Sequence, residues 1–328
     1  MPQKILEVEN LTTEFHVEEG VARAVDGVSF DLTAGETLGI VGESGSGKSV
    51  TSLSLMRLVP DPPGRILPGS RIMIDGQSIM ELSERKMQKI RGTEIAMIFQ
   101  DPMTALNPVF TIGSQLSEVL MRHQDLDARA AQRRSVELLE MVGIPAPDKR
   151  VHEYPHQLSG GMRQRAMIAM ALSCNPKILL ADEPTTALDV TIQAQILELI
   201  NQLQRKIRMA TILITHDLAV VAETCDRVIV MYCGRIVEEA GVYELFAAPR
   251  HPYTRGLIDS IPRIDEPEGE EPRELNAIPG IVPDIHSLPP GCRFSDRCFK
   301  AQDKCRGENP ELASDKESGR RVACHFPL

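Results

Sequence analysis

Residues 37–49 read TLGIVGESGSGKS, and this stretch decides the fold of the chain. An apolar run typical of a strand, residues 37–41, leads directly into a loop of glycine and serine. The loop fits the pattern G-x-x-x-x-G-K-[ST], in which backbone N–H groups wrap phosphates, the lysine reaches the β and γ phosphates and the serine hydroxyl ligates Mg²⁺. The alternative is a glycine-rich turn without a ligand. We expect a nucleotide site built from Gly42, Ser44, Gly45, Ser46, Gly47, Lys48 and Ser49.

Strand patterns and helix patterns alternate on both sides of this loop. Helical spacing begins directly after it, with apolar residues at positions 53, 55, 56 and 58, and ends before the proline cluster at residues 60–63. Strands alternating with helices imply a largely parallel sheet. We therefore predict an α/β fold with a P-loop NTPase core. The further strands are expected at residues 5–8, 28–32, 178–181, 211–215 and 228–231, and a helix at residues 192–203.

The sequence also predicts a division into domains. Residues 112–142 show an amphipathic helical pattern, interrupted by a charged stretch at residues 125–134, and predict a helical subdomain at about residues 101–165. After about residue 250 the composition shifts, and residues 265–274 hold six acids, one base and two prolines. We expect an ATPase domain over residues 1–250 and a C-terminal extension over residues 251–328.

Composition restricts the class of protein. A net charge of −10 over 328 residues argues against broad nucleic-acid binding, which depends on clustered Lys and Arg. The longest apolar run, residues 166–172, is far shorter than the roughly 18 to 20 residues that cross a bilayer. The N-terminus lacks the apolar core of a signal peptide. We expect a chain that stays in the cytosol.

A second group of residues with phosphate chemistry lies at residues 178–183, ILLADE. An apolar strand here ends in two acids, of which Asp182 is placed to hold Mg²⁺ and Glu183 to polarise an attacking water. A solvated strand end with helix-capping acids is the alternative. His216 ends another run of strand type, ATILIT, where a histidine can be catalytic or simply exposed.

Residues 158–165, LSGGMRQR, resemble the signature motif of ABC ATPases, and the resemblance spans about residues 4–245. It implies that Gln100 contacts Mg²⁺, that residues 187–189 form the D-loop and that His216 is the switch histidine. It also implies that Phe15 stacks on adenine and that Val50 contacts the nucleotide. In this family the signature loop closes over the P-loop of a second subunit, so Ser159, Gly160 and Gly161 would serve the partner's ATP.

Three further stretches resemble the dipeptide and oligopeptide importer branch of that family: YPHQLSGGM, QDPMTALNP and HPYT at residues 154–162, 100–108 and 251–254. The resemblance implies an ATPase that powers import of di- and oligopeptides from the cytoplasmic face of the cell membrane. Its implied partners are a second, non-identical ATPase subunit, two transmembrane permeases and an external solute-binding protein. Gln100 and the segment after it would pass the nucleotide state to a permease helix.

Four of the seven cysteines lie in the last 37 residues, with spacing C-x5-C-x6-C-x18-C. Disulfides are not expected in the cytosol, and a small tail with little apolar content needs a staple such as a metal. The spacing fits neither a zinc ribbon nor a ferredoxin run. Resemblance to the tails of peptide-importer ATPases implies a 4Fe-4S cluster on Cys292, Cys298, Cys305 and Cys324, with Zn²⁺ and free thiols as the alternatives.

Other functions stay open at this point. Import of nickel or another small solute would use the same motifs, because the solute never touches this subunit. A non-transport ABC ATPase acting on nucleic acid is disfavoured by the acidic charge and by the single motor domain. An interaction module with an inactive nucleotide site is disfavoured because Lys48, Asp182, Glu183 and His216 are all present.

Overall fold

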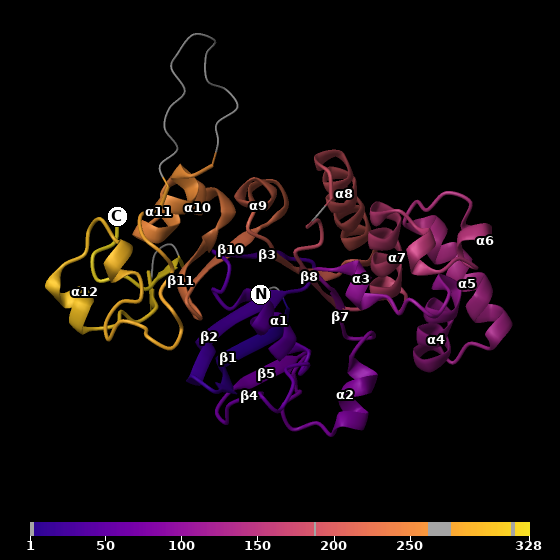
Figure 1. Cartoon of the computed structure of the whole chain (residues 1–328), viewed down its shortest axis with the longest axis horizontal. Coiled ribbons are helices and arrows are strands. Elements are labelled where there is room, and N and C mark those ends of the chain that lie inside the picture. Colours follow the sequence, from indigo (N-terminus) through magenta and orange to yellow (C-terminus); the bar gives the residue numbers. More distant parts are fainter. Residues whose placement is uncertain (1–2, 187, 262–276, 316–318) are drawn as a thin grey trace, which may run out of the picture. The chain divides into compact units, whose positions relative to one another are not determined.

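The computed structural model describes residues 3–186, 188–261, 277–315 and 319–328. The chain divides into two compact units, one of residues 1–7, 31–36 and 72–214, the other of residues 8–30, 37–71 and 215–328. Figure 1 shows the helices and strands along the chain. The expected domain boundary at residue 250 lies inside the second unit and stays a prediction, and the acidic linker expected at residues 265–274 lies outside the described residues.

The first unit is built on three parallel strands, β7 (Ile95–Ile98), β8 (Ile178–Asp182) and β9 (Ala210–Ile214). In their register Ile98 faces Ala181, and Asp182 faces Ile214. All three strands are buried along their whole length, as parallel strands covered on both faces are. The strands predicted at residues 178–181 and 211–215 and their parallel pairing are confirmed here, whereas β7 was not predicted from the sequence.

Most of the remaining elements of the first unit are helices, and α4, α5 and α7 pack against one another as a helical group (Figure 1). The charged stretch at residues 125–134 interrupts the helical pattern less than predicted, because Asp127 caps α5 by accepting the Ala130 N–H at 2.8 Å. The elements are β5 (Arg71–Ile74), β6 (Gln77–Ser78), α2 (Glu84–Ile90), α3 (Pro102–Ala105), α4 (Ile112–Gln124), α5 (Ala128–Met141), α6 (Pro147–Arg150), η1 (Pro155–Gln157), α7 (Gly160–Leu172) and α8 (Val190–Ile207).

The second unit centres on β3 (Thr37–Val41), which pairs in parallel with β10 (Arg227–Tyr232). Strand β11 (Arg235–Gly241) returns antiparallel to β10, and the tail adds β13 (Arg321–Val322) beside β11. The long strands β1 (Lys4–Val17) and β2 (Gly20–Thr33) contribute residues to both units. The other elements are α1 (Lys48–Leu55), β4 (Gly64–Ile66), α9 (Leu218–Thr224), α10 (Val242–Ala247), α11 (Pro252–Asp259), η2 (Ser295–Arg297), α12 (Asp303–Gly307) and β12 (Ala313–Ser314).

A buried carboxylate, Glu238 on β11, joins three parts of the second unit. It accepts the backbone N–H groups of Arg250 and His251 at 2.7 and 2.8 Å and the guanidinium of Arg320 at 3.1 Å. Glu238 has no exposed surface, and a buried charge of this kind is tolerated only when it is paired and hydrogen-bonded. The contacts therefore tie β11 to the start of α11 and to the tail. No helix among the described residues is long and apolar enough to cross a membrane.

His251 gives the second unit a pH-dependent stability. The side chain is 1% exposed, and burial lowers its pKa from 6.5 to about 3. Between these values the unfolded chain binds a proton that the folded chain does not. The contribution of His251 to the free energy of unfolding is therefore fully present above pH 6.5 and is lost as the pH falls toward 3. We expect His251 to remove about 2 kcal/mol of unfolding free energy between pH 7 and pH 5.

Urea unfolding at the two pH values measures this loss, with His251→Asn as the matched variant. Asparagine can still cap α11 as His251 does when it accepts the Tyr253 N–H, but it does not titrate. An equal pH dependence in both proteins would contradict the prediction.

Candidate nucleotide site

The loop between β3 and α1 is shaped by two glycines that have no room for a side chain. Gly42 and Gly47 have φ of 151° and 100°, values that favour glycine. A Cβ on Gly42 would lie 2.2 Å from the carbonyl oxygen of Met231, and one on Gly47 would lie 2.3 Å from that of Ala24. The back of the loop is therefore packed directly on the backbone of β2 and β10.

Lys48 is the first residue of α1, and its ammonium group lies against the backbone of the loop. Its ammonium donates to the carbonyl oxygens of Gly42 and Glu43 at 2.8 and 2.9 Å, and the residue is 6% exposed. Gly45, with φ of 79°, has open space on the side where a Cβ would point. A helix start with N–H groups beside a buried ammonium suits a polyphosphate, so these residues fit a nucleoside triphosphate. Ser49, the second residue of α1, and Val50 are half-buried, and Ser44 is exposed.

Phe15 lies on β1 opposite Gly64 of β4 and is half-buried. A Cβ on Gly64 would lie 2.7 Å from the Phe15 ring, so the ring packs directly on this glycine. The contact gives Phe15 a structural partner that the sequence did not indicate. Its stacking on adenine stays a prediction.

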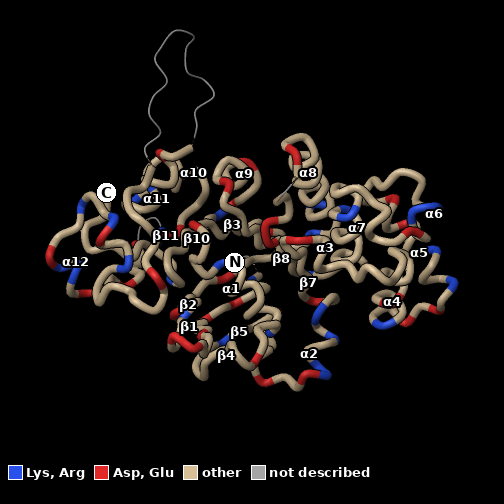
Figure 2. Tube along the Cα trace, in the orientation of Figure 1, with Lys and Arg blue, Asp and Glu red and all other residues tan. Residues whose placement is uncertain are grey.

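The first unit brings together Gln100 and Glu183, which the sequence analysis named separately. Asp182 ends β8 at 4% exposure, and Glu183 follows with φ of 46°; Figure 2 shows acidic residues at this end of β8. One carboxylate oxygen of Glu183 accepts hydrogen bonds from Gln100 Nε2 and from the Thr186 hydroxyl, both at 2.8 Å. The sequence did not indicate Thr186. The signal that could have found it is its position three residues after Glu183, where a threonine hydroxyl can reach back to the carboxylate.

The remaining predicted site residues are placed as follows. Ser159 caps α7, because its hydroxyl accepts the Met162 N–H at 3.3 Å, and Gly160 and Gly161 open the helix. His216 lies exposed in the second unit, just before α9. Ala187 of the expected D-loop lies outside the described residues. The roles given to Ser159, Gly160, Gly161 and His216 stay predictions.

The structure does not support the metal predicted in the tail. Cys298, Cys305 and Cys324 lie near enough to Cys292 for their charges to raise its pKa, but burial is the larger cause and takes that pKa to about 11. Within the described part of the chain, no three Cys, His, Asp or Glu residues form a group that could hold a metal ion. An iron-sulfur cluster on these cysteines is thus an expectation that the arrangement of the thiols does not bear out.

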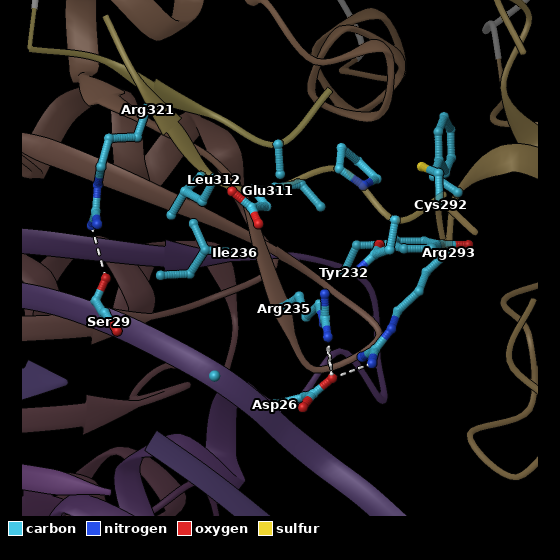
Figure 3. A pocket seen from close by; sticks show the side chains of 16 residues that line it. Asp26, Ser29, Tyr232, Arg235, Ile236, Cys292, Arg293, Glu311, Leu312 and Arg321 are labelled. Atoms are coloured by element: carbon cyan, nitrogen blue, oxygen red, sulfur yellow. Dashed lines mark hydrogen bonds and ion pairs between the residues drawn. The ribbon is translucent and has the colours of Figure 1, made fainter. Parts of the chain in front are cut away.

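The tail is attached instead by arginines. Arg293 and Arg235 both donate to Asp26 of β2, beside a cavity of about 330 Å³ that also contains Cys292 and Arg321 (Figure 3). Burial raises the pKa of Asp26, but the hydrogen bonds and charges of the two arginines outweigh it and hold the pKa below 3.8. Arg321 donates to the Ser29 carbonyl at 2.8 Å in the same cavity.

The loop, the acidic strand end and the Ser-Gly-Gly helix start define an ABC-type ATPase. The family model described as "ABC transporter" matches residues 25–186, and the one described as "Oligopeptide/dipeptide transporter, C-terminal region" matches residues 237–305. A solved "Dimeric Structure of MJ0796, a Bacterial ABC Transporter Cassette" is 28% identical, with a TM-score of 0.64 over 72% of this chain and 98% of the other.

Two curated relatives match nearly end to end. The "Oligopeptide transport ATP-binding protein AppD" of Bacillus subtilis (strain 168) is 56% identical over 98% of this chain and 96% of its own. The "Dipeptide transport ATP-binding protein DppD" of Escherichia coli (strain K12) is 49% identical over 99% and 97%. The chain belongs to the oligopeptide/dipeptide transporter family of ABC ATP-binding subunits, as the sequence predicted.

Glu183→Gln tests the candidate base. Glutamine keeps a hydrogen-bond acceptor for Gln100 and Thr186 but cannot accept a proton, so ATP turnover is expected to fall by at least about 100-fold. ATP-dependent dimerisation should survive. Phosphate release and size-exclusion chromatography with ATP measure the two effects, with the exposed Glu140→Gln on α5 as control. Undiminished phosphate release from Glu183→Gln would exclude this role.

Proposed function

We propose that this chain hydrolyses ATP to power the import of di- and oligopeptides across the cytoplasmic membrane. One observation carries the proposal: a complete set of nucleotide motifs shares the chain with a C-terminal region of the oligopeptide/dipeptide transporter type. The relatives named for oligopeptide and dipeptide transport match this combination over almost their whole length. The proposed domains are an ATPase domain at residues 1–250 and an extension at residues 251–328.

ATP lies between two ATPase subunits in this proposal. Lys48, Ser49 and the loop glycines of one subunit hold the phosphates, and residues 159–161 of the other complete the site. The open side of Gly45 and the glycine-opened start of α7 support this arrangement, because a helix start attracts phosphate. The second subunit is non-identical, as the resemblance implies.

Glu183 accepts a proton from the attacking water, with Gln100 and Thr186 fixing its carboxylate. Bound Mg²⁺ would supply neutralisation of the phosphate charge, and Ser49, Asp182 and Gln100 are the residues that would hold it. Asp182 is suited to this because it is buried at the end of β8. His216 is proposed as the switch histidine, as the resemblance to ABC ATPases implies.

The permeases are proposed to dock on the segment around α3 and the start of α4. This segment exposes three large apolar side chains, Met103, Val109 and Phe110, at 56%, 70% and 51%. Exposed apolar groups in one short segment favour a protein contact. The segment also begins next to Gln100, which contacts Glu183, so docking and hydrolysis share one piece of chain.

Val109→Asp together with Phe110→Asp tests the docking segment. Charges there should lower co-purification with the permeases at least tenfold, because each would be desolvated in an apolar contact. ATP binding by the isolated subunit should persist. Tyr243→Asp on α10, where the tyrosine is 86% exposed, is the matched control. Equal co-purification of both variants would contradict the docking site.

The solute is tested with the complete transporter in lipid vesicles. Uptake of a labelled dipeptide should require ATP and the solute-binding protein and should stop with Glu183→Gln. A labelled pentapeptide and Ni²⁺ are tested as alternative solutes in separate assays. ATP-dependent uptake of Ni²⁺ without uptake of either peptide would contradict peptide import and favour nickel import.

The metal that the sequence predicted in the cysteine tail is not supported by the arrangement of the described residues, and metal analysis tests it directly. Iron and zinc are measured in protein purified without oxygen, together with the absorbance near 400 nm. Iron with that absorbance would favour a cluster, stoichiometric zinc would favour the alternative, and neither metal would leave the four cysteines as thiols.

A further inference from the structure

The phosphate loop carries an acid, Glu43, that is held by the tail. Arg297 donates to both carboxylate oxygens of Glu43, at 2.6 and 2.9 Å, in a two-point contact across 254 positions of sequence. The Arg297 side chain is 5% exposed and that of Glu43 is 29% exposed. The bidentate geometry makes this one of the stronger ion pairs that a protein can form.

Other groups of the second unit hold the same two residues. The backbone N–H of Glu43 donates to the Tyr253 hydroxyl at 2.9 Å, and Arg297 donates to the Pro279 carbonyl at 2.9 Å and to the Tyr232 hydroxyl at 3.3 Å. The hydrogen bond to Glu43 is the main cause that raises the pKa of Arg297 above its ordinary value. Both the backbone and the side chain of Glu43 are thus fixed from outside the loop.

Glu43 in turn contacts the lysine of the nucleotide site. Its carbonyl oxygen accepts from the Lys48 ammonium at 2.9 Å. A shift of Glu43 therefore moves an acceptor of the group that must reach the phosphates. In addition, a carboxylate without a partner in this loop would repel a triphosphate, and the repulsion between like charges is strong near a protein surface.

We propose that Arg297 of the C-terminal extension is a positioning residue of the nucleotide site, which orients the phosphate loop and neutralises Glu43 so that the triphosphate can bind. Arg297 does not touch the phosphates in this proposal. It acts through Glu43 and, one contact further, through Lys48.

The place of Arg297 in the tail connects this site to the cysteines. Arg297 ends η2 and directly precedes Cys298. Four residues earlier, Arg293 fixes the same segment to Asp26 of β2 (Figure 3). A rearrangement of the segment between Cys292 and Cys298 would therefore change the ion pair between Arg297 and Glu43.

Arg297→Ala in the full-length chain is the first test. Binding of Mg²⁺ and a fluorescent ATP analogue should weaken roughly tenfold, because the loop loses its support and gains an unpaired negative charge. Arg306→Ala, an exposed arginine of α12, is the matched control and should bind as the unchanged protein does. Unchanged affinity in a folded Arg297→Ala protein would overturn the proposal.

Two more variants separate this role from simple support of the tail. Arg297→Lys keeps the charge and loses the two-point contact, so it should weaken binding by less than Arg297→Ala. Glu43→Gln combined with Arg297→Ala removes the unpaired carboxylate and should recover at least threefold of the lost affinity. A double variant as weak as Arg297→Ala would overturn the electrostatic part.

Thermal unfolding of each variant shows whether the second unit still folds. If Arg297→Ala fails to fold, the Arg297→Lys protein carries the test, and an affinity equal to that of the unchanged protein in a folded Arg297→Lys variant would overturn the proposal. The proposal rests on the nucleotide site alone. Its failure would leave peptide transport untouched, and a different solute would leave the nucleotide affinities untouched.

Discussion

The back of the phosphate loop has no space for side chains, and the nucleotide site depends on this constraint. A loop that presents its N–H groups to phosphates must be supported from behind by other backbone. Here that support comes from the carbonyl groups of Ala24 and Met231, which lie against Gly47 and Gly42. The loop can keep its shape only while β2 and β10 stay in place beside it.

Four acids of the second unit, two of them buried and two partly buried, create a second constraint, which the tail satisfies. Each of four acids is met by an arginine from the last 36 residues, and buried carboxylates need such partners. The pairs are Asp26 with Arg293, Glu43 with Arg297, Glu238 with Arg320 and Glu239 with Arg321. The tail is therefore part of the electrostatics of the unit that holds the phosphate loop, whatever its cysteines bind.

In the first unit, the Gln100 and Thr186 side chains that donate to the Glu183 carboxylate are uncharged, unlike the arginines of the tail. Asp182 is buried at the end of a strand, whereas Glu183 sits in a left-handed backbone conformation with its carboxylate fixed by Gln100 and Thr186. Both donors are uncharged side chains, and together they fix the orientation of the carboxylate. The segment after Gln100 exposes Met103, Val109 and Phe110, so one stretch of chain runs from the Glu183 contact to the surface.

The sequence by itself determined the central strands β3, β8, β9 and β10, the parallel pairing, the phosphate loop and the family, because apolar period and glycine spacing are local properties. It also named Gln100 and Glu183, but not their contact. Only the tertiary structure decided that Arg297 reaches Glu43, that Tyr253 holds the same residue and that the four tail cysteines are not grouped for a metal. Such contacts join residues up to 254 positions apart, and no local pattern specifies which arginine of a charged tail meets which acid.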